Sequence, residues 1–587
     1  MIAMSYNSGD KKRGRLILAA LGLIPVIWLA LLYAPHLSSG LVGIMYGFSE
    51  SIQNPFDIKI VQDTPRAVLI FIALYVFGIG IWLSSVRNTR PREEHGSASW
   101  GNARTLGAKY ANRKPLQNII LSQNVRIGLD GFKHKRNLNV LVVGGSGAGK
   151  TRYFALPNIM QCNTSFIILD PKAELLRTTG HLLKENGYDV RILDLIHMEW
   201  SDGYNPFVYI RNDADVMKLV TNLIKSTTPK GSNTNDPFWE RAETALLQAL
   251  IYYLWHYAPE DEQNFGMVME MLAAAEVRED NEEYLSPLDV LFERKEMEEP
   301  DSIAVRQYKA YRAGSGKTLK SILISLSVRL EKFMLSSLAN IVSRDDLDMA
   351  SIGENKTALF ILISDNDTSF NFIVGMLYIQ LFQQLYDVAD YKYHGRLPIP
   401  VHFLMDEFAN IALPDDFEKI LSTCRSRAIS CSIIIQNIAQ IKALFEKQWE
   451  SITGNCDEFV YLGGNEQATH EYVSKLLGKE TIVADSHGKV HGPRGNFSTN
   501  QRQEGRELLT PDEVRLLDNA HEILFIRGEK AVKDLKYDVL RHPNVSLTAA
   551  GGVDPYLHGI HGTVSETPVE ITFNPDREYE IFTSEEL

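Results

Sequence analysis

The chain contains little cysteine and no excess of positive charge. Only four cysteines occur among its 587 residues, and they form no CxxC or Cys/His pattern. This scarcity argues against a disulfide framework or a zinc site and favours a protein whose body lies in the reduced cytosol. The formal net charge of -13 argues against a protein that coats nucleic acid, because such proteins are usually basic. Any contact with DNA must therefore be confined to a local patch or pore.

The rest of the composition is typical of a folded protein. Apolar residues make up 45% of the chain and charged residues 23%, a balance found in well-packed globular proteins rather than in disordered ones. A chain of 587 residues is too long for one compact domain, so we expect two or three folded units.

Two long uncharged runs stand near the N-terminus, at 16–34 and 67–86. Each is long enough to cross a hydrocarbon layer of about 30 Å as a helix. A cleaved signal peptide is the alternative for the first run, but that run is longer than an ordinary signal core and a second run follows it. We therefore predict a membrane anchor at 1–90 with two transmembrane helices.

Basic residues lie mainly outside the two runs. The segment between the runs holds only Lys59 and Arg66, whereas the outer flanks carry Lys11, Lys12, Arg13, Arg15, Arg87, Arg90 and Arg92. The positive-inside rule then places both termini in the cytoplasm. This predicts a multi-pass protein of the cell membrane whose remaining chain is cytoplasmic.

An apolar run at 137–143 indicates a buried strand and leads directly into a complete GxxxxGK[ST] motif. In such a loop the backbone N–H groups curl around phosphates, Lys150 reaches the β- and γ-phosphates, and the Thr151 hydroxyl binds Mg²⁺. A helix that starts at Lys150 adds the positive end of its dipole. The motif predicts ATP and Mg²⁺ as cofactors, bound by Gly144, Gly145, Ser146, Gly147, Ala148, Gly149, Lys150 and Thr151.

A similar glycine-rich string at 314–318 lacks the required spacing. Tyr311 occupies the position where the first glycine of the motif should stand, and no predicted strand precedes it. We predict a turn there that opens a helix over 319–342, and no second nucleotide site.

A second apolar strand, at 399–406, ends in the acidic pair Asp406 and Glu407. In an ATPase that already has its phosphate loop, the first acid holds Mg²⁺ and the second orients the attacking water as a base. The alternative is an acidic pair that merely opens a helix.

Three more predicted strands, at 165–169, 358–363 and 429–435, end in polar residues as well. Ligands of open α/β sheets bind outside the carboxyl ends of the parallel strands, so we expect all these polar ends to gather at the nucleotide. Gln436 directly follows the last of the three and is placed to sense the γ-phosphate.

Two arginines precede that last strand and are candidates for an arginine finger. Such a finger is given by a neighbouring subunit and stabilises the charge that develops during phosphoryl transfer. Arg425 is the preferred candidate, and Arg427 is the alternative. Either one can also be an ordinary solvated charge.

Helical patterning without a clear strand dominates 204–350. Within it, the stretch 302–332 is strongly basic and carries tyrosines among its cations. Basic and aromatic side chains together suit single-stranded DNA, because they bind its phosphates and stack on its bases. The hypothesis is that Arg306, Lys309 and Arg312 face DNA, and the alternative is a solvated helix face.

Two segments near the C-terminus show no clear periodicity. The polar, glycine-rich stretch 485–505 is predicted to be a flexible loop. Residues 543–587 form a tail that becomes acidic towards its end, as disordered solubilising tails do.

The motifs occur in an order that resembles one family. The two apolar runs, followed by GGSGAGKTR, DPKAE, LMDEFAN and SIIIQN, resemble the TraG-like conjugative coupling proteins, which are ATPases of type IV secretion systems. Further similar stretches lie at 235–254, 317–330 and 506–517. The resemblance therefore covers most of the chain.

The resemblance implies a fold, an assembly and a cargo. The fold is a RecA-like P-loop NTPase domain of the α/β class in two parts, 91–203 and 351–542, with an inserted all-α domain at 204–350 and two transmembrane helices before it. The assembly is a homo-hexamer in which ATP hydrolysis drives single-stranded DNA with its relaxase, the relaxosome, into the type IV secretion channel. In similar proteins an acidic C-terminus helps to dock the relaxosome.

Two other functions stay open on the residues alone. One is a receptor that recruits protein substrates to the same channel, with ATPase activity secondary. The other is a septal-type translocase of double-stranded DNA. That family usually has more membrane spans and a C-terminal winged-helix module, and the sequence shows neither pattern.

Overall fold

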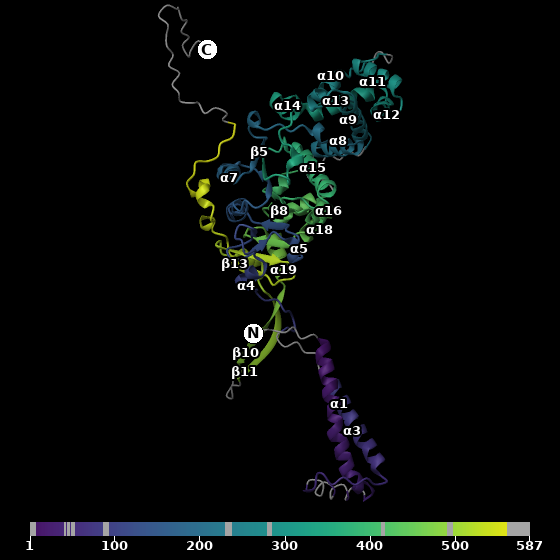
Figure 1. Cartoon of the computed structure of the whole chain (residues 1–587), viewed down its shortest axis with the longest axis vertical. Helices are drawn as coiled ribbons and strands as arrows, with labels where there is room; N and C mark the ends of the chain where they lie inside the picture. The colour runs from purple at the N-terminus through teal and green to yellow at the C-terminus, as the bar shows by residue number, and fades with distance from the viewer. Residues whose placement is uncertain are drawn as a thin grey trace, which may run out of the picture. The chain divides into compact units, whose positions relative to one another are not determined.

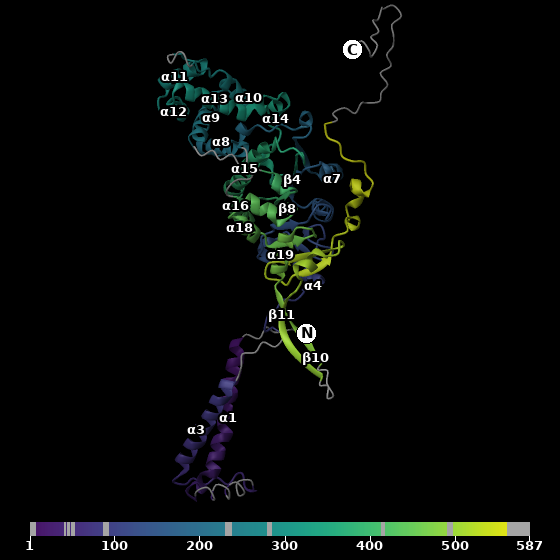
Figure 2. The same ribbon diagram turned by 180° about the vertical axis from the view of Figure 1, so that it is seen from behind.

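The computed structural model of the chain describes residues 8–39, 43, 47, 53–85, 93–228, 237–278, 284–411, 417–489 and 497–559. Two compact units result, one formed by residues 1–95 and 483–503 and the other by residues 96–482 and 504–587. Figure 1 and, from behind, Figure 2 show their elements.

The first unit contains two long apolar helices, α1 (Ser8–Tyr33) and α3 (Thr64–Ser85). They pack on each other where the Tyr75 hydroxyl donates to the carbonyl of Ala19 at 2.9 Å. Gly22 makes this approach possible, because a Cβ there would lie 1.9 Å from the Tyr75 hydroxyl. The short 3₁₀ helix η1 (Ala34–Ser39) follows α1.

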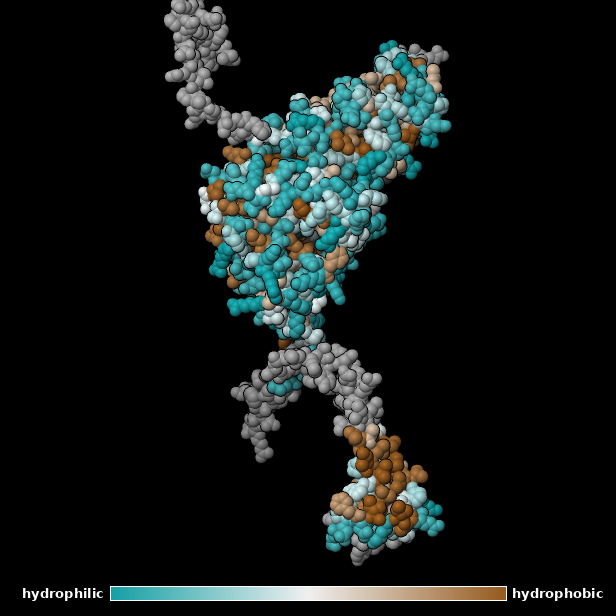
Figure 3. Space-filling model, viewed as in Figure 1, coloured by the Kyte–Doolittle hydropathy of each residue, from teal (hydrophilic) through white to brown (hydrophobic). Residues whose placement is uncertain are grey.

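Segments Ala19–Ser38 and Thr64–Trp82 are long and apolar enough to cross a membrane, judged by length and composition. Large apolar side chains on them stand exposed, among them Ile24, Leu69 and Phe77, and brown apolar atoms dominate these helices on the face shown in Figure 3. A core helix of a soluble protein would bury such side chains. The two segments are therefore candidates for a membrane anchor. Arg87, Arg90 and Arg92 lie outside the described residues.

The second unit is built on a large sheet. Its described strands lie in the order β13-β12-β9-β3-β8-β7-β4-β6-β5. Strands β3 to β9 pair in parallel, whereas β12 pairs with β9 and β13 in antiparallel fashion. The strands are β3 (Val140–Val143), β4 (Ser165–Asp170), β5 (Asp189–Asp194), β6 (Thr357–Leu362), β7 (Val401–Met405), β8 (Ile429–Ile435), β9 (Glu458–Tyr461), β12 (His521–Ile526) and β13 (Val532–Leu535).

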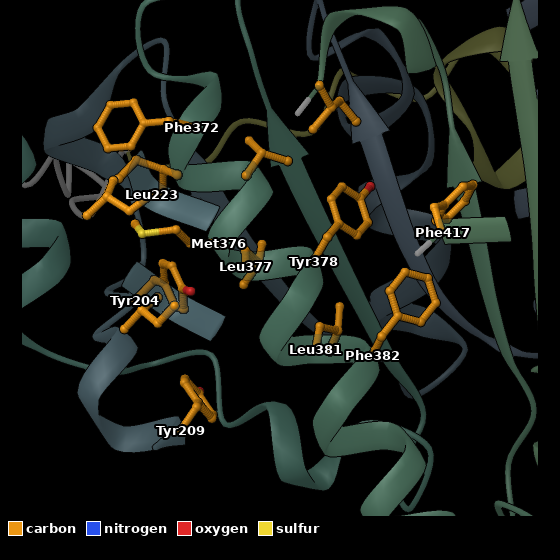
Figure 4. Packing of buried hydrophobic residues seen from close by; sticks show 14 of the residues in the cluster. Tyr204, Tyr209, Leu223, Phe372, Met376, Leu377, Tyr378, Leu381, Phe382 and Phe417 are labelled. Carbon is orange, nitrogen blue, oxygen red and sulfur yellow. The ribbon is translucent and has the colours of Figure 1, made fainter. Parts of the chain in front are cut away.

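Helices cover both faces of this sheet and bury its apolar strands. Strand β4 connects to β5 through α7 (Glu174–Glu185), and β6 connects to β7 through α15 (Asn371–Asp387). Figure 4 shows the core around α15, where its residues Phe372, Met376, Leu377, Tyr378, Leu381 and Phe382 pack with Tyr204, Tyr209, Leu223 and Phe417.

Shorter elements complete the unit around the sheet. They are α4 (Ala103–Tyr110), β1 (Asn118–Ile120), β2 (Arg126–Gly128), α5 (Gly131–His134), α6 (Leu156–Ile159), α16 (Phe417–Thr423), α17 (Ile438–Leu444), α18 (Trp449–Gly454), α19 (Gln467–Leu477) and α20 (Pro511–Arg515).

A helical segment joins β5 to β6, and it holds no strand within its described residues. Figures 1 and 2 agree that its helices gather at one end of the second unit, with β13 and α4 at the other end. The helices are α8 (Asp213–Thr227), α9 (Pro237–Tyr257), α10 (Phe265–Ala273), α11 (Pro287–Glu298), α12 (Ile303–Arg312), α13 (Gly316–Leu330) and α14 (Ser336–Ser343).

The helix predicted over 319–342 is broken in the structure. Helix α13 ends at Leu330, the 3₁₀ turn η6 (Glu331–Met334) follows, and α14 begins at Ser336. The break buries Phe333, whose ring stacks on Phe265 with centroids 4.4 Å apart. Aromatic packing between elements thus overrides the continuous helical pattern of the sequence.

The flexible loop predicted at 485–505 is wrong in part. Strands β10 (Lys479–Lys489) and β11 (Phe497–Glu507) pair in a two-stranded sheet, and residues 490–496 lie outside the described part. Backbone hydrogen bonds form this ribbon, and its polar, glycine-rich residues carry no apolar alternation that would announce a strand.

The C-terminal segment is described up to residue 559. Its Tyr556 is buried against α7, where the backbone N–H of Tyr556 donates to the carbonyl of Arg177 at 2.8 Å. Gly180 leaves room for the ring, since a Cβ there would lie 2.3 Å from it. The acidic end of the predicted tail lies outside the described residues.

Candidate nucleotide site

The loop after β3 has the conformation that the motif predicts. Gly147 and Gly149 take positive φ values of 78° and 84°, which glycine adopts without strain. At Gly149 a Cβ would also lie 2.4 Å from the Tyr153 ring. The backbone N–H groups of Ser146, Gly147 and Gly149 donate to no acceptor within the described chain. A curled loop with free N–H groups is a binding site for an anion such as phosphate.

Three contacts hold this loop from outside. The N–H of Gly144 donates to the carbonyl of Ile435 at 3.1 Å, and that of Gly145 donates to the carbonyl of Gly463 at 2.9 Å. The Lys536 ammonium donates to the carbonyl of Ala148 at 3.0 Å. Neither Gly463 nor Lys536 could be predicted from the sequence, because both lie hundreds of residues from the motif and belong to no recognised pattern.

Lys150 is a buried cation without a hydrogen bond or ion pair in the part of the chain that the structure describes. Its exposed fraction is 9%. A buried charge is costly unless a partner neutralises it, so this position fits an anionic ligand. The helix starts at Lys150, as predicted, and it continues as a π turn at Thr151–Ala155 and then as α6.

Two oxygen-bearing side chains meet beside the loop, as expected of a Mg²⁺ site. The Thr151 hydroxyl donates to Oδ2 of Asp406 at 3.0 Å. Burial raises the pKa of Asp406, while the Thr151 hydrogen bond and the charge of Lys150 oppose that shift. Hydroxyl and carboxylate oxygens are ligands that Mg²⁺ prefers. The residues therefore fit both a nucleotide and its metal ion.

Glu407 and Gln436 also come together here, because β7 and β8 are neighbours. Nε2 of Gln436 donates to Oε1 of Glu407 at 3.1 Å and to Oε2 at 3.2 Å. Glu407 has a φ of 54°, which costs energy in a residue other than glycine. Strain of this kind is concentrated at functional sites.

The remaining polar strand ends divide into two groups. Asp170, at the end of β4, is buried and accepts N–H groups of Leu176, Glu174 and Lys172. Burial raises its pKa to about 6, and the charge of Asp406 adds to the shift. Ser364 and Asp365, after β6, instead line a cavity of about 300 Å³ together with Pro171 and Lys172, which follow Asp170. The sheet order explains this, because β4 separates β6 from β7, so the expectation that all polar ends gather is wrong for β6.

Both candidate finger arginines lie before β8, in the 3₁₀ turn η10 (Cys424–Arg427). They therefore stand at the amino edge of the sheet, whereas the phosphate loop follows the carboxyl end of β3. Arg427 pairs with Asp390 at 2.5 Å and lies over the Tyr386 ring at 4.2 Å. Arg425 donates to the carbonyl of Gly131 at 3.1 Å. Neither makes a hydrogen bond to the phosphate loop of its own chain.

The three cations predicted to face DNA differ in their surroundings. Arg306 is exposed on α12. Lys309 pairs with Glu296 at 2.5 Å, and Arg312 pairs at 3.1 Å with Asp289, which is buried.

The predicted stacking of bases on the neighbouring tyrosines is wrong. Tyr308 and Tyr311 are only 6% and 3% exposed. Tyr308 stacks on Phe292 with centroids 4.0 Å apart and donates to Asp289 at 2.8 Å. Both tyrosines belong to the core of the helical segment.

A family model described as type IV secretory system conjugative DNA transfer matches residues 102–546. The match includes the phosphate loop, the helical segment and every strand of the large sheet. The chain belongs to this family.

The chain is also similar in sequence to proteins named for DNA transfer. The VirD4 protein of Rhizobium radiobacter is 24% identical over 483 residues, which are 80% of this chain and 66% of the relative. The conjugal transfer protein TraG of Escherichia coli is 24% identical over 466 residues, which are 71% of this chain and 70% of the relative. The chain thus spans slightly less than two thirds of the VirD4 protein.

Solved structures confirm the fold class. The unbound bacterial conjugative coupling protein TrwBdeltaN70 superposes with a TM-score of 0.54 at 16% identity, over 77% of this chain and 95% of that one. TrwB in complex with the non-hydrolysable ATP analogue ADPNP gives a TM-score of 0.53 at 16% identity, over 76% of this chain and 95% of that one. The predicted RecA-like P-loop domain with an inserted all-α part is thereby confirmed as the fold.

Proposed function

We propose that the chain is a membrane-anchored ATPase that couples ATP hydrolysis to the transfer of single-stranded DNA and its relaxase into a type IV secretion channel. One observation carries the proposal. Lys150 is buried and has no partner among the described residues, in a loop whose N–H groups are likewise free there, and it lies beside the Thr151 and Asp406 oxygens in a chain of the conjugative DNA transfer family.

Each side chain of the nucleotide site has a separate role in ATP hydrolysis. The loop N–H groups and Lys150 bind the phosphates of ATP, and Thr151 and Asp406 hold Mg²⁺, which neutralises charge on the phosphates when bound. Glu407 acts as the base that orients a water, and Gln436 donates towards the γ-phosphate. Burial of Asp406 and Lys150 makes these interactions stronger than they would be in water.

The position of Arg425 supports a ring of subunits, which we propose is a homo-hexamer. The turn η10 lies before β8, at the edge of the sheet opposite the phosphate loop. An arginine finger at Arg425 must therefore act on the nucleotide of a neighbour. Arg427 is less suited to this role, because its guanidinium already pairs with Asp390.

The two apolar helices support an anchor in the cell membrane with both termini in the cytoplasm. We further propose that residues 91–203 and 351–542 form the motor and that 204–350 form the inserted domain, which matches the placement of α8–α14 between β5 and β6. Single-stranded DNA would be contacted through Arg306, with Lys309 and Arg312 in supporting positions.

Phosphate release by the detergent-purified full chain, measured with and without single-stranded DNA, tests the ATPase. Lys150→Ala should abolish release, because it removes the cation at the phosphates. Lys317→Ala is the matched control, since Lys317 stands in the similar Gly316–Thr318 string and should leave release unchanged. Absence of any Lys150-dependent release would refute the proposal.

The same variant separates a motor from a receptor for protein substrates. In cells, a motor with Lys150→Ala loses DNA transfer while it still binds the relaxase. A receptor whose ATPase activity is secondary keeps transfer. The measurement is transfer frequency together with relaxase co-purification.

A further inference from the structure

Lys536 is a second buried lysine at the phosphate loop. It directly follows β13, and its exposed fraction is 7%. Its ammonium donates to the carbonyl of Ala148 at 3.0 Å and lies 5.4 Å from the centre of the Tyr153 ring. Lys536 is far from the loop in sequence, and its side chain makes no other hydrogen bond or ion pair among the described residues.

The contact has a geometric consequence for the next peptide group. A peptide bond is planar and trans, so the Ala148 carbonyl and the Gly149 N–H point in opposite directions. A donor that holds the carbonyl on one side therefore presents the N–H on the other. Gly149 is one of the loop residues whose N–H finds no acceptor in the described chain.

The Lys536 ammonium also changes the electron distribution of the peptide group between Ala148 and Gly149. A cation at the carbonyl polarises the group and makes the attached N–H a stronger donor, an effect that a low local dielectric enhances. Because Lys536 is buried, water screens this interaction little.

Neighbouring residues keep Lys536 in place. Glu522 on β12 is 1% exposed and lies opposite Asp534 on β13. Asp534 accepts the Ser122 hydroxyl at 2.6 Å and the Asn124 amide at 2.8 Å, and the backbone N–H of Lys536 donates to the carbonyl of Ala520 at 2.9 Å. Burial raises the pKa of Glu522 well above its usual range. Burial lowers the pKa of Lys536, and the charge of Glu522 opposes that shift.

We propose that Lys536 is a positioning residue of the nucleotide site, which holds the Ala148 carbonyl so that the Gly149 N–H faces a bound diphosphate. The inference rests on the proposed ATP binding and deepens it. The ligand class is a nucleotide with a β-phosphate, because the backbone of such a loop cradles the α- and β-phosphates.

The test is the binding of ADP and AMP, each with Mg²⁺, to the detergent-purified full chain. Lys536→Met should weaken ADP binding about tenfold, the loss of one charge-assisted hydrogen bond, and should change AMP binding much less. Lys536→Arg retains a cation and should recover most of the affinity, whereas Lys536→Gln should not. Lys533→Met, at an exposed lysine of the same strand, is the control and should bind ADP as the wild type does.

The outcomes separate this inference from the proposed function. If the wild type binds ADP in a Lys150-dependent manner and Lys536→Met binds it equally well, the positioning role is overturned and the ATPase proposal stands. If the wild type shows no Lys150-dependent binding, both fail. Equal loss of ADP and AMP affinity marks a general structural role and overturns the inference. If the Met variant does not fold, equal ADP affinity of the Arg and Gln variants overturns it as well.

Discussion

The Gln436 side chain holds both oxygens of the Glu407 carboxylate, with Nε2 at 3.1 Å from Oε1 and 3.2 Å from Oε2. In this arrangement the amide group of Gln436 uses part of the acceptor capacity of both oxygens, which makes the carboxylate a weaker base. A γ-phosphate offers the same amide group a stronger, charged acceptor. We therefore expect ATP, but not ADP, to draw Gln436 away and to free Glu407 as a base.

Gln436→Ala should lower the rate of ATP hydrolysis about a hundredfold, because one donor to the developing charge is lost. ADP affinity should stay within threefold, since ADP lacks the phosphate that Gln436 contacts. Single-turnover hydrolysis and ADP titration measure the two effects. Gln448→Ala, at an exposed glutamine, is the control. A loss of ADP affinity as large as the loss of rate would contradict the assignment.

Thr151→Val should remove the dependence of ADP affinity on Mg²⁺. Valine keeps the shape of threonine but lacks the hydroxyl that now donates to Asp406. We expect about tenfold weaker ADP binding in Mg²⁺ and unchanged binding in chelator, measured by titration. Thr178→Val on α7, where the hydroxyl donates to the Glu174 carbonyl of the same helix, should behave like the wild type. Equal weakening in both buffers would speak against a metal role.

Arg425→Ala should abolish ATP hydrolysis at the nucleotide site of the adjacent subunit, not at the site of the subunit that carries the substitution. Subunits with Arg425→Ala and subunits with Lys150→Ala should each be inactive alone, because an arginine finger contributes at least about a thousandfold. Mixed together, they should recover activity, since an intact loop then meets an intact arginine. Phosphate release from the mixture measures this recovery. Its absence would place Arg425 outside the reaction.

Arg427→Ala should lower the stability of the fold and leave the rate of hydrolysis nearly unchanged. The variant loses the ion pair with Asp390, both members of which are partly exposed, so the free energy of unfolding should fall by about 1 kcal/mol. Its rate of hydrolysis should remain near that of the wild type. A rate loss comparable to that of Arg425→Ala would reverse the roles of the two arginines.

Acid should destabilise the second unit through His402. This side chain is 4% exposed between the hydroxyls of Ser430 and Ser432, and burial lowers its pKa from 6.5 to about 4. The stabilisation is present above pH 6.5 and is lost as the pH falls towards 4, because the unfolded chain takes up the proton first. At pH 5 the loss is about 2 kcal/mol.

The measurement is the free energy of unfolding of wild type and His402→Gln at pH 7.5 and pH 5. The variant should show a pH effect smaller by about 2 kcal/mol. Part of the effect will persist, because burial also lowers the pKa of His542 to about 4. His181→Gln, at an exposed histidine, is the matched control. Identical curves for His402→Gln and wild type would show that His402 does not titrate as described.

Arg306→Ala should reduce the salt dependence of single-stranded DNA binding by about one phosphate contact. Arg294→Ala, on the exposed face of α11, is the control. Arg312→Ala should instead lower stability by about 2 kcal/mol, because it leaves the buried Asp289 with one partner fewer. The measurement is the affinity for single-stranded DNA as a function of salt concentration. If Arg306→Ala leaves the slope of this dependence unchanged, α12 does not contact the DNA.

The centre of the sheet was readable from the sequence. Strands β4, β6, β7 and β8 are buried along their length, so each is rich in apolar residues even though β7 contains His402 and β8 contains Ser430 and Ser432. The predicted bounds 429–435 agree with β8. Strands β9 and β12 escaped notice because each carries a buried acid, Glu458 and Glu522 respectively. A charged residue in a short apolar run is typical of an exposed segment. The neighbouring strands that bury it are distant in sequence, so local sequence does not predict its burial.

The site was readable only where its residues adjoin a motif. Contacts such as Lys536 with Ala148 join distant positions, and no local pattern records them. The tyrosines of α12 illustrate the opposite error. Tyr308 and Tyr311 stand three residues apart on one helix face, so that basic and aromatic residues alternate in sequence even though the aromatics face the core.

The helical segment between β5 and β6 is an enlarged crossover connection. Two neighbouring parallel strands need such a connection in any case, and the cost of closing it grows only slowly with its length. Helix α8 packs on α15 through Leu223 (Figure 4) and so is tied to the sheet, whereas α10, α12 and α13 pack on α9 and can be lengthened or exchanged with less effect on β3, β7 or β8. These outer helices can therefore change in sequence and length while the nucleotide site keeps its geometry, and they are the place in the second unit where a foreign segment can be grafted.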